Sequence, residues 1–139
     1  MTGLLNGEVA LVTGAGRGFG RAIAERFARE GAKVALFARS RDQIEQAAEA
    51  IRAAGGKALA VAGDATVRAD VDRAVAAAEA ELGPLTLFVN NAGTPGPFGP
   101  IWEVDPDQWW QAQELHIRAP VLFLNRILPG MIERGRGRS

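Results

Sequence analysis

The sequence predicts an α/β protein built on one doubly wound parallel sheet. Three observations lead to this fold class: short apolar runs alternate with longer amphipathic segments, capping residues separate them, and a glycine-rich loop follows the first run. The 139 residues suit one domain, since domains average about 150 residues. A chain of this size buries roughly two thirds of its unfolded surface, which is enough for a core without disulfides.

Four apolar runs are predicted as buried parallel strands, at residues 9–12, 33–37, 58–62 and 85–89. A helical pattern follows each run, so strand and helix alternate four times. Right-handed crossovers between parallel strands then give the sheet order 3-2-1-4. We expect further strands beyond the fourth.

Two of the helical patterns have a clear apolar face. Ile44 and Val67 each begin a set of apolar residues spaced three and four apart. Ser40 and Asp105 stand where helices are predicted to begin, each three residues before a glutamine. Three of the predicted helices are each followed by a glycine that ends them: Gly31, Gly55 and Gly83.

The last helix, predicted over residues 106–133, is apolar on nearly all sides. Such a helix must be covered on two faces, by the sheet and by a partner or a missing part of the domain. We therefore expect a homo-oligomer or an incomplete domain. The fourth strand is expected to be a bare edge, which also favours dimerisation or aggregation.

Composition excludes several kinds of chemistry. The chain has no cysteine, no tyrosine and one histidine, so thiol catalysis, zinc held by cysteines and paired imidazole ligands are excluded, and we expect no metal. Sixteen basic and sixteen acidic residues balance, which favours small-molecule or protein partners over nucleic acid or membrane. No apolar stretch approaches a span of about 20 residues, and we expect a cytoplasmic protein. The basic end, residues 134–139, is interpreted as a polar turn rather than a nucleic-acid-binding arm.

The glycine-rich loop is predicted to bind a phosphate group. It lies between the first strand and the first helix, where backbone N–H groups and the helix N-terminus can approach a pyrophosphate. The spacing Thr-Gly-x-x-x-Gly-x-Gly, through Gly14, Gly18 and Gly20, is neither a P-loop nor G-x-G-x-x-G. The alternative is an ordinary tight turn.

The end of the second strand indicates which dinucleotide would bind. A protein that prefers NAD places an acidic residue here for the ribose 2′-hydroxyl. This chain has Ala38 followed by Arg39, whose guanidinium suits a 2′-phosphate, and Arg17 can add a second charge. NADP is therefore favoured over NAD, with a solvated surface charge as the alternative for Arg39.

Two further loops follow the third and fourth strands. Asp64 can accept the adenine amino hydrogens, or it can cap the turn near Thr66, and the two interpretations weigh equally. The Asn-Asn-Ala-Gly run at 90–93 can bind loop backbone and let a ribose pass, although alone it could be a turn. All four loops fall at the carboxyl ends of parallel strands, where open α/β sheets bind ligands.

Taken in this order, the glycine motif, Asp64 and the Asn-Asn-Ala-Gly run resemble the short-chain dehydrogenase/reductase family, over the chain as far as Glu133. The resemblance implies a Rossmann-type fold, cytosolic homodimers or tetramers, and hydride transfer between a nicotinamide and a small carbonyl or alcohol substrate. It implies that Arg39 meets the 2′-phosphate, that Asp64 and Ala65 meet adenine, and that two loops hold the rest of the cofactor: Gly14, Arg17, Gly18, Phe19 and Gly20 at the pyrophosphate and ribose, and Asn90, Asn91, Ala92 and Gly93 at the adenosine ribose.

The chain departs from the family pattern twice. His116 stands where the family has an asparagine that orders a proton-relay water, which makes it a candidate catalytic residue or an ordinary helix residue. Pro120 lacks the N–H that would bond the His116 carbonyl, so that carbonyl could still hold the water. The family's catalytic Ser and Tyr-x-x-x-Lys lie beyond the next strand, so residues 1–139 would be a NAD(P)-binding domain truncated before the fifth strand and inactive by itself.

The function predicted from sequence is therefore the cofactor-binding half of an NADP-dependent short-chain oxidoreductase. One alternative is a non-catalytic dinucleotide-binding or interaction module whose last helix docks a partner. Another is a different doubly wound nucleotide-binding protein. Residues 94–100 could border the substrate space, but turns explain their glycines and prolines equally well.

Overall fold

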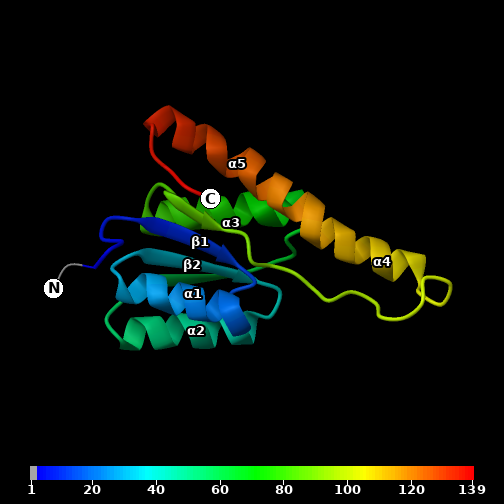
Figure 1. Cartoon of the computed structure of the whole chain (residues 1–139). Helices are drawn as coiled ribbons and strands as arrows, with labels where there is room; N and C mark the ends of the chain where they lie inside the picture. Colours follow the sequence, from blue (N-terminus) through cyan, green and yellow to red (C-terminus); the bar gives the residue numbers. More distant parts are fainter. Residues whose placement is uncertain (1–2) are drawn as a thin grey trace.

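The computed structural model describes residues 3–139 and contains one four-stranded parallel sheet (Figure 1). The order is β3-β2-β1-β4, which confirms the predicted order, and the strands are β1 (Val9–Thr13), β2 (Lys33–Ala38), β3 (Ala58–Ala62) and β4 (Leu87–Val89). β4 begins later than predicted. Thr86, just before it, meets β1 through both backbone and side chain: its N–H donates to the Val9 carbonyl at 2.9 Å, and its hydroxyl accepts the Val9 N–H at 2.9 Å.

Helices cover both faces of the sheet, as the doubly wound fold requires (Figure 1). On one face lie α1 (Gly18–Arg29) and α2 (Arg41–Ala53). On the other lie α3 (Arg68–Leu82) and α5 (Ala119–Arg134). Each face has its own apolar core, and within residues 3–139 no helix is long and apolar enough to cross a membrane.

Local signals at the helix ends act as predicted. The Ser40 hydroxyl accepts the Gln43 N–H at the start of α2. Asp105 likewise caps α4 (Pro106–Gln113), although it bonds the N–H of Asp107 rather than that of the glutamine. All three predicted end glycines have positive φ, a conformation that other residues rarely adopt: Gly31, Gly55 and Gly83.

Three phenylalanines fasten α5 to the sheet. Phe123 of α5 meets Phe37 of β2 edge-on, with ring centroids 5.3 Å apart, and stacks on Phe88 of β4 at 5.2 Å. Aromatic pairs in these geometries contribute about 0.5 to 1.5 kcal/mol each beyond their buried area. The position of α5 is therefore set by specific contacts.

The predicted single helix over 106–133 is wrong in detail. A π-helical segment, η1 (Glu114–Arg118), separates α4 from α5, and the three form one rod (Figure 1). In α5, the inner face of the rod is buried against the sheet. The outer face of the rod exposes a row of apolar side chains: Trp110, Ile117, Val121, Leu128 and Ile132. We call this row the apolar stripe.

The end of the chain returns to the sheet. Gly135, with φ of 67°, closes α5, and the Arg136 N–H reaches back to the Met131 carbonyl at 3.0 Å. The Arg138 backbone then bonds to Thr86 and Phe88, forming a parallel bridge with Leu87 of β4. The expectation of a bare fourth strand is therefore wrong, because the glycine turn directs the chain against the edge of β4.

The basic end is held within the protein. Arg134 donates to the Leu85 carbonyl at 2.7 Å, and Arg136 pairs with Glu8 at 2.7 Å. These guanidinium groups stabilise the return of the chain to the sheet. The structure thus favours the interpretation of residues 134–139 as a polar turn.

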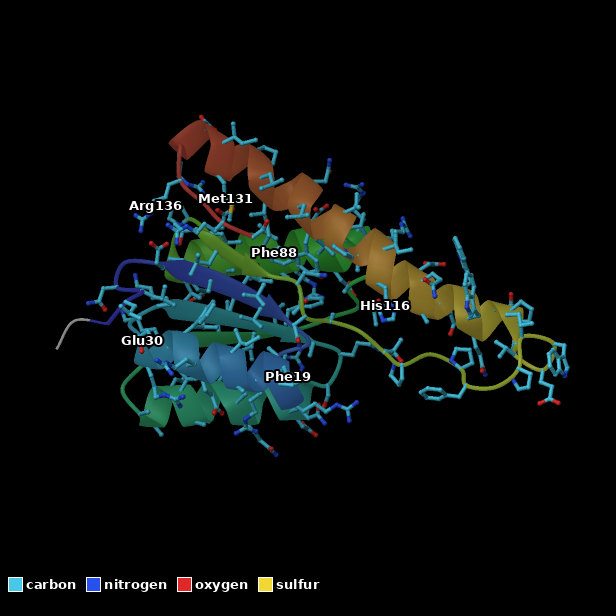
Figure 2. The ribbon with its side chains drawn as sticks, in the orientation of Figure 1. Phe19, Glu30, Phe88, His116, Met131 and Arg136 are labelled. Atoms are coloured by element: carbon cyan, nitrogen blue, oxygen red, sulfur yellow. The ribbon has the colours of Figure 1, made fainter. Side chains whose placement is uncertain are left out.

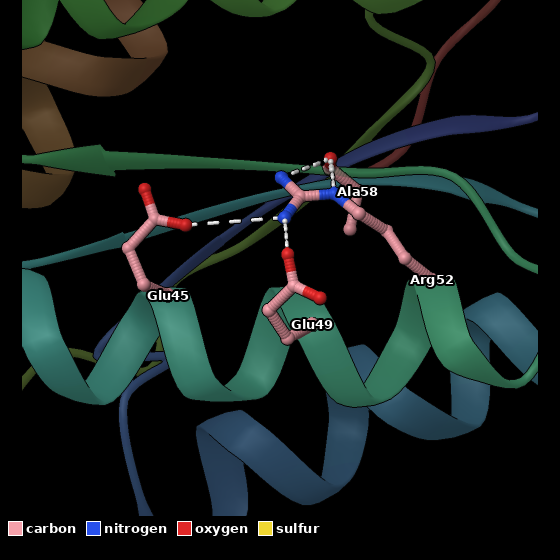
Figure 3. A network of polar contacts seen from close by, with 4 residues as sticks. All are labelled: Glu45, Glu49, Arg52 and Ala58. Atoms are coloured by element: carbon pink, nitrogen blue, oxygen red, sulfur yellow. Dashed lines mark hydrogen bonds and ion pairs between the residues drawn. The ribbon is translucent and has the colours of Figure 1, made fainter.

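At the other edge of the sheet, Arg52 of α2 contacts the start of β3 (Figure 3). Its guanidinium donates twice to the Ala58 carbonyl, at 3.2 and 3.0 Å, and pairs with Glu49 at 2.9 Å and Glu45 at 3.9 Å. A charged group on an edge strand discourages pairing with another chain.

Candidate cofactor-binding site

The glycine loop has the geometry of a phosphate cradle. Gly14 and Gly18 have φ of 62° and 58°, which favour glycine. A side chain at Gly20 would strike the Gly14 carbonyl oxygen, so the loop and α1 can approach only without it. The first turn of α1 has no side-chain cap and no acidic residue. Its N–H groups and the positive end of the helix dipole are therefore free to bind an anion.

Thr13 and Asn91 join this loop to the one after β4. The buried Thr13 hydroxyl oxygen accepts the N–H groups of Asn91 and Ala92, both at 3.0 Å. The Asn91 side chain donates to the Gly14 carbonyl at 3.2 Å. The glycine motif includes Thr13, but the sequence predicts no role for its hydroxyl group. Its signal was a polar residue at the end of an apolar strand.

Arg39 follows the end of β2 and is exposed. In the described part of the chain no carboxylate lies within 4.0 Å of its guanidinium. Arg17 and Phe19 are exposed beside the glycine loop, with Phe19 at the N-terminal end of α1 (Figure 2). The predicted cations are thus at the predicted edge and available to a ligand.

Asp64 follows β3 and lies near Arg39. Its Oδ1 accepts the Thr66 N–H at 2.9 Å and the Thr66 hydroxyl at 2.7 Å, which is the local cap considered from the sequence. Burial of the Asp64 carboxyl group raises its pKa, but the bonds from Thr66 and the charge of Arg39 outweigh burial and hold the pKa below its ordinary value. Asp64 is therefore ionised at neutral pH and accepts hydrogen bonds only.

A cavity of about 560 Å³ opens at this edge of the sheet. Arg39 and Asp64, which the sequence assigned to the adenosine end of a dinucleotide, both line it. Thr66 of the loop after β3 also lines it, and its other walls come from the loop after β4 and from the rod. The loop residues Thr94, Gly96 and Pro97 belong to the segment 94–100, for which the sequence left a border of the substrate space and simple turns as alternatives. The rod residues were not predicted as site residues: Gln108, Gln111, Ala112, Glu114 and Leu115. The glycine loop and residues 90–93 belong to the same edge but do not line this cavity, and Ala65 is buried beside it.

His116 lies in η1, where the rod passes this edge (Figure 2). Its Nε2 accepts the Thr94 N–H at 3.0 Å. A Cβ on Gly93 would come within 3.3 Å of the same nitrogen, so the ring packs directly against that glycine. The sequence placed His116 near a reacting centre, and the structure gives its Nε2 a backbone partner.

The π-helical turn explains the backbone at His116. The Ala119 N–H bonds the Glu114 carbonyl five residues back, and Pro120 has no N–H to offer. The His116 carbonyl therefore has no donor four residues ahead, as predicted. Within residues 3–139 no group of three or more metal-binding side chains gathers.

The parallel strand order and a glycine loop that leads into a helix N-terminus are the arrangement of dinucleotide-binding α/β proteins. A glycine loop that a Cβ would block, an uncapped helix N-terminus and an unpaired arginine fit a nicotinamide dinucleotide. The family model of the short chain dehydrogenases matches residues 8–138. The chain belongs to this family, whose members are dehydrogenases and reductases that bind NAD(P).

Curated relatives and solved structures agree. The chain is 41% identical to a short chain dehydrogenase of Pseudocercospora fijiensis, over 97% of this chain and 44% of that protein. It is 37% identical to 2-(S)-hydroxypropyl-CoM dehydrogenase 3 of Xanthobacter autotrophicus, over 99% of this chain and 53% of that protein. The chain thus spans about half the length of these relatives.

Two solved structures match with a TM-score of 0.90 each. One is a metagenomic short-chain oxidoreductase in complex with NADP, 36% identical, with 96% of this chain and 60% of that chain covered. The other is L-sorbose reductase from Gluconobacter frateurii complexed with NADPH and L-sorbose, 38% identical, with coverage of 99% and 52%. Both support the predicted Rossmann-type fold.

Proposed function

We propose that this chain is the NADP-binding half of a short-chain oxidoreductase that acts on a small carbonyl or alcohol. The observation that carries the proposal is Arg39, which is exposed, unpaired in the described residues and on the wall of the cavity that Asp64 also lines. A cation in this position suits a 2′-phosphate, whereas an NAD-preferring protein has an acid there. The solved relatives in complex with NADP and NADPH support the same choice.

The proposed roles follow the loops. The N–H groups of Gly18, Phe19 and Gly20 bind the pyrophosphate, with Gly14 giving room and Arg17 adding charge. Asp64 and the buried Ala65 meet adenine. Asn90 to Gly93 pass along the ribose, fixed by the bond from Asn91 to the glycine loop.

When bound, the nicotinamide would supply or accept the hydride. The residues of this chain would bind and orient the cofactor. The sequence has no tyrosine, so it holds no phenolic proton donor. We therefore propose that the 139-residue chain binds cofactor but does not by itself reduce a carbonyl.

The test is a titration of the chain with NADPH, NADH and 2′,5′-ADP, followed by the fluorescence of its three tryptophans and by calorimetry. Saturable binding of NADPH and 2′,5′-ADP, with weaker binding of NADH, is the expected result. Equal affinity for NADPH and NADH would contradict the assignment to NADP. Absence of binding to all three would contradict the whole proposal.

We also propose that the protein forms homo-oligomers through the apolar stripe. Ile117, Val121 and Ile132 are 65%, 62% and 76% exposed, and adjacent exposed apolar side chains mark contact surfaces. Light scattering after gel filtration should give a mass above that of one chain. A Val121→Glu variant should reduce that mass, because it places a charge in the covered surface.

The apolar stripe is also the one observation that favours a second function, a binding module that docks a different partner. The two functions predict different cofactor binding and a different mass in solution. A protein that stays monomeric and binds none of the three nucleotides would favour the binding module.

A further inference from the structure

His116 joins the rod to the loop that follows β4. The Thr94 N–H donates to its Nε2 at 3.0 Å, and the ring fills the space beside Gly93. Thr94, together with Glu114 and Leu115 of η1, lines the 560 Å³ cavity. The His116 imidazole thus joins the loop after β4, which forms one wall of the cavity, to η1, which forms the neighbouring wall.

This bond requires a neutral ring. Nε2 can accept an N–H only when it carries no proton itself, so the proton of the neutral ring is on Nδ1. A protonated imidazole has two N–H donors and no acceptor, and would face the Thr94 N–H with another donor. Protonation must therefore break this contact.

The rod has a second contact with the cavity that does not titrate in this way. Arg118 donates to the Thr66 carbonyl at 3.4 Å, and arginine keeps its charge. Protonation of His116 would thus release the loop after β4 and leave the loop after β3 attached.

The charged groups around His116 come from three directions. Glu114 and Arg118 belong to η1 itself and lie 3.9 Å apart. Arg39 and Asp64 stand across the cavity, after β2 and β3. The loop from Gly93 to Trp102 has no charged residue. A control must therefore separate the imidazole from the two carboxylates.

We propose that His116 is a positioning residue whose neutral imidazole holds the loop after β4 against the cofactor cleft, and whose protonation releases that loop. The contact belongs to the unliganded chain. Its consequence for cofactor affinity rests on the proposed function.

The first experiment uses nuclear magnetic resonance on the unliganded chain. Because the chain has one histidine, its imidazole signals need no assignment among several. The neutral ring should show the proton on Nδ1. The Thr94 amide should exchange with solvent about two to ten times faster, relative to its intrinsic rate, once the ring is protonated. Ala92 lies two residues before Thr94 in the same loop, and its N–H donates to the Thr13 hydroxyl. The exchange rate of the Ala92 amide should not change.

Two variants separate the bond from packing. His116→Gln keeps an acceptor of similar reach that does not titrate, so Thr94 should stay protected at both pH values. His116→Phe keeps a ring beside Gly93 but removes the acceptor, so Thr94 should exchange quickly at both. Neutral His116 with its proton on Nε2, or a Thr94 amide equally protected in His116→Phe, would overturn the proposal.

The second experiment measures the NADPH dissociation constant of the same three proteins at about pH 8 and about pH 5.5. The wild-type affinity should fall in acid by about two- to tenfold more than that of His116→Gln. An equal fall in both would show that the effect does not come from the His116 imidazole, and would refute the cofactor consequence. If no protein binds NADPH, the proposed function fails, while Thr94 exchange still decides the role of His116.

Discussion

The replacement of Arg39 by aspartate is the sharpest test of the cofactor assignment. Arg39 lines the cavity, has no ion-pair partner within residues 3–139, and lies close enough to Asp64 to lower its pKa. The change removes the proposed donor to the 2′-phosphate and places a carboxylate there. Hydrogen bonds to charged groups contribute about 1.5 to 3 kcal/mol, and solvent around an exposed arginine reduces this. We expect NADPH binding to weaken by about 1 to 3 kcal/mol, or roughly 5- to 150-fold.

The assay compares dissociation constants for NADPH and NADH at one salt concentration. NADH, which lacks the 2′-phosphate, should change much less. Arg29→Asp is the matched control, because Arg29 is also exposed and makes the same charge change near the C-terminal end of α1. An equal loss of both cofactors in Arg39→Asp, or an equal loss of NADPH in Arg29→Asp, would refute the assignment to the 2′-phosphate.

Three other changes test the site. Thr13→Val leaves two N–H groups of the loop after β4 without their acceptor. It should lower the free energy of unfolding in urea by about 2 to 4 kcal/mol and also weaken NADPH binding. The control Thr86→Val, at the opposite end of the sheet, should lower the free energy of unfolding without weakening NADPH binding. Gly20→Ala should abolish NADPH binding, since its Cβ would strike the Gly14 carbonyl; a variant that binds normally would contradict the cradle. The pKa of Asp64 is lowered in the folded protein, so its ionised carboxylate stabilises the fold at pH values above the unfolded pKa. This contribution to the free energy of unfolding is lost as the pH falls through the folded pKa. Acid unfolding followed by circular dichroism should show the loss in the wild type and not in Asp64→Asn.

Features set by local sequence could be predicted. The order of the strands follows from alternating strands and helices, because right-handed crossovers leave few arrangements. Positive φ at Gly31, and the Ser40 cap, depend on neighbours within a few residues. The positions of Arg39 and Asp64 followed in the same way, since each lies at the carboxyl end of its strand.

Features that join distant segments could not. The bond between Thr13 and Asn91 spans 78 residues, and that between Thr94 and His116 spans 22. Which polar group meets which depends on how loops pack, and the sequence offers many candidates of equal chemistry. Pro120 was a local signal of irregularity in the rod near η1, because its missing N–H disturbs the helical bonds before it.

The rod connects the two proposed properties of this protein. Its inner side presents Glu114 and Leu115 to the cavity, while Ile117 and Val121 expose the apolar stripe on its outer side. A second copy covering the stripe would restrict the rod that carries His116, and a bound cofactor would restrict the same rod from within. Two ligands that stabilise one arrangement strengthen each other's binding to the same extent. NADPH should therefore shift the chain toward the oligomer in sedimentation experiments, and NADPH affinity should rise with protein concentration. A Val121→Glu variant that shows the same concentration dependence as wild type would separate the two properties.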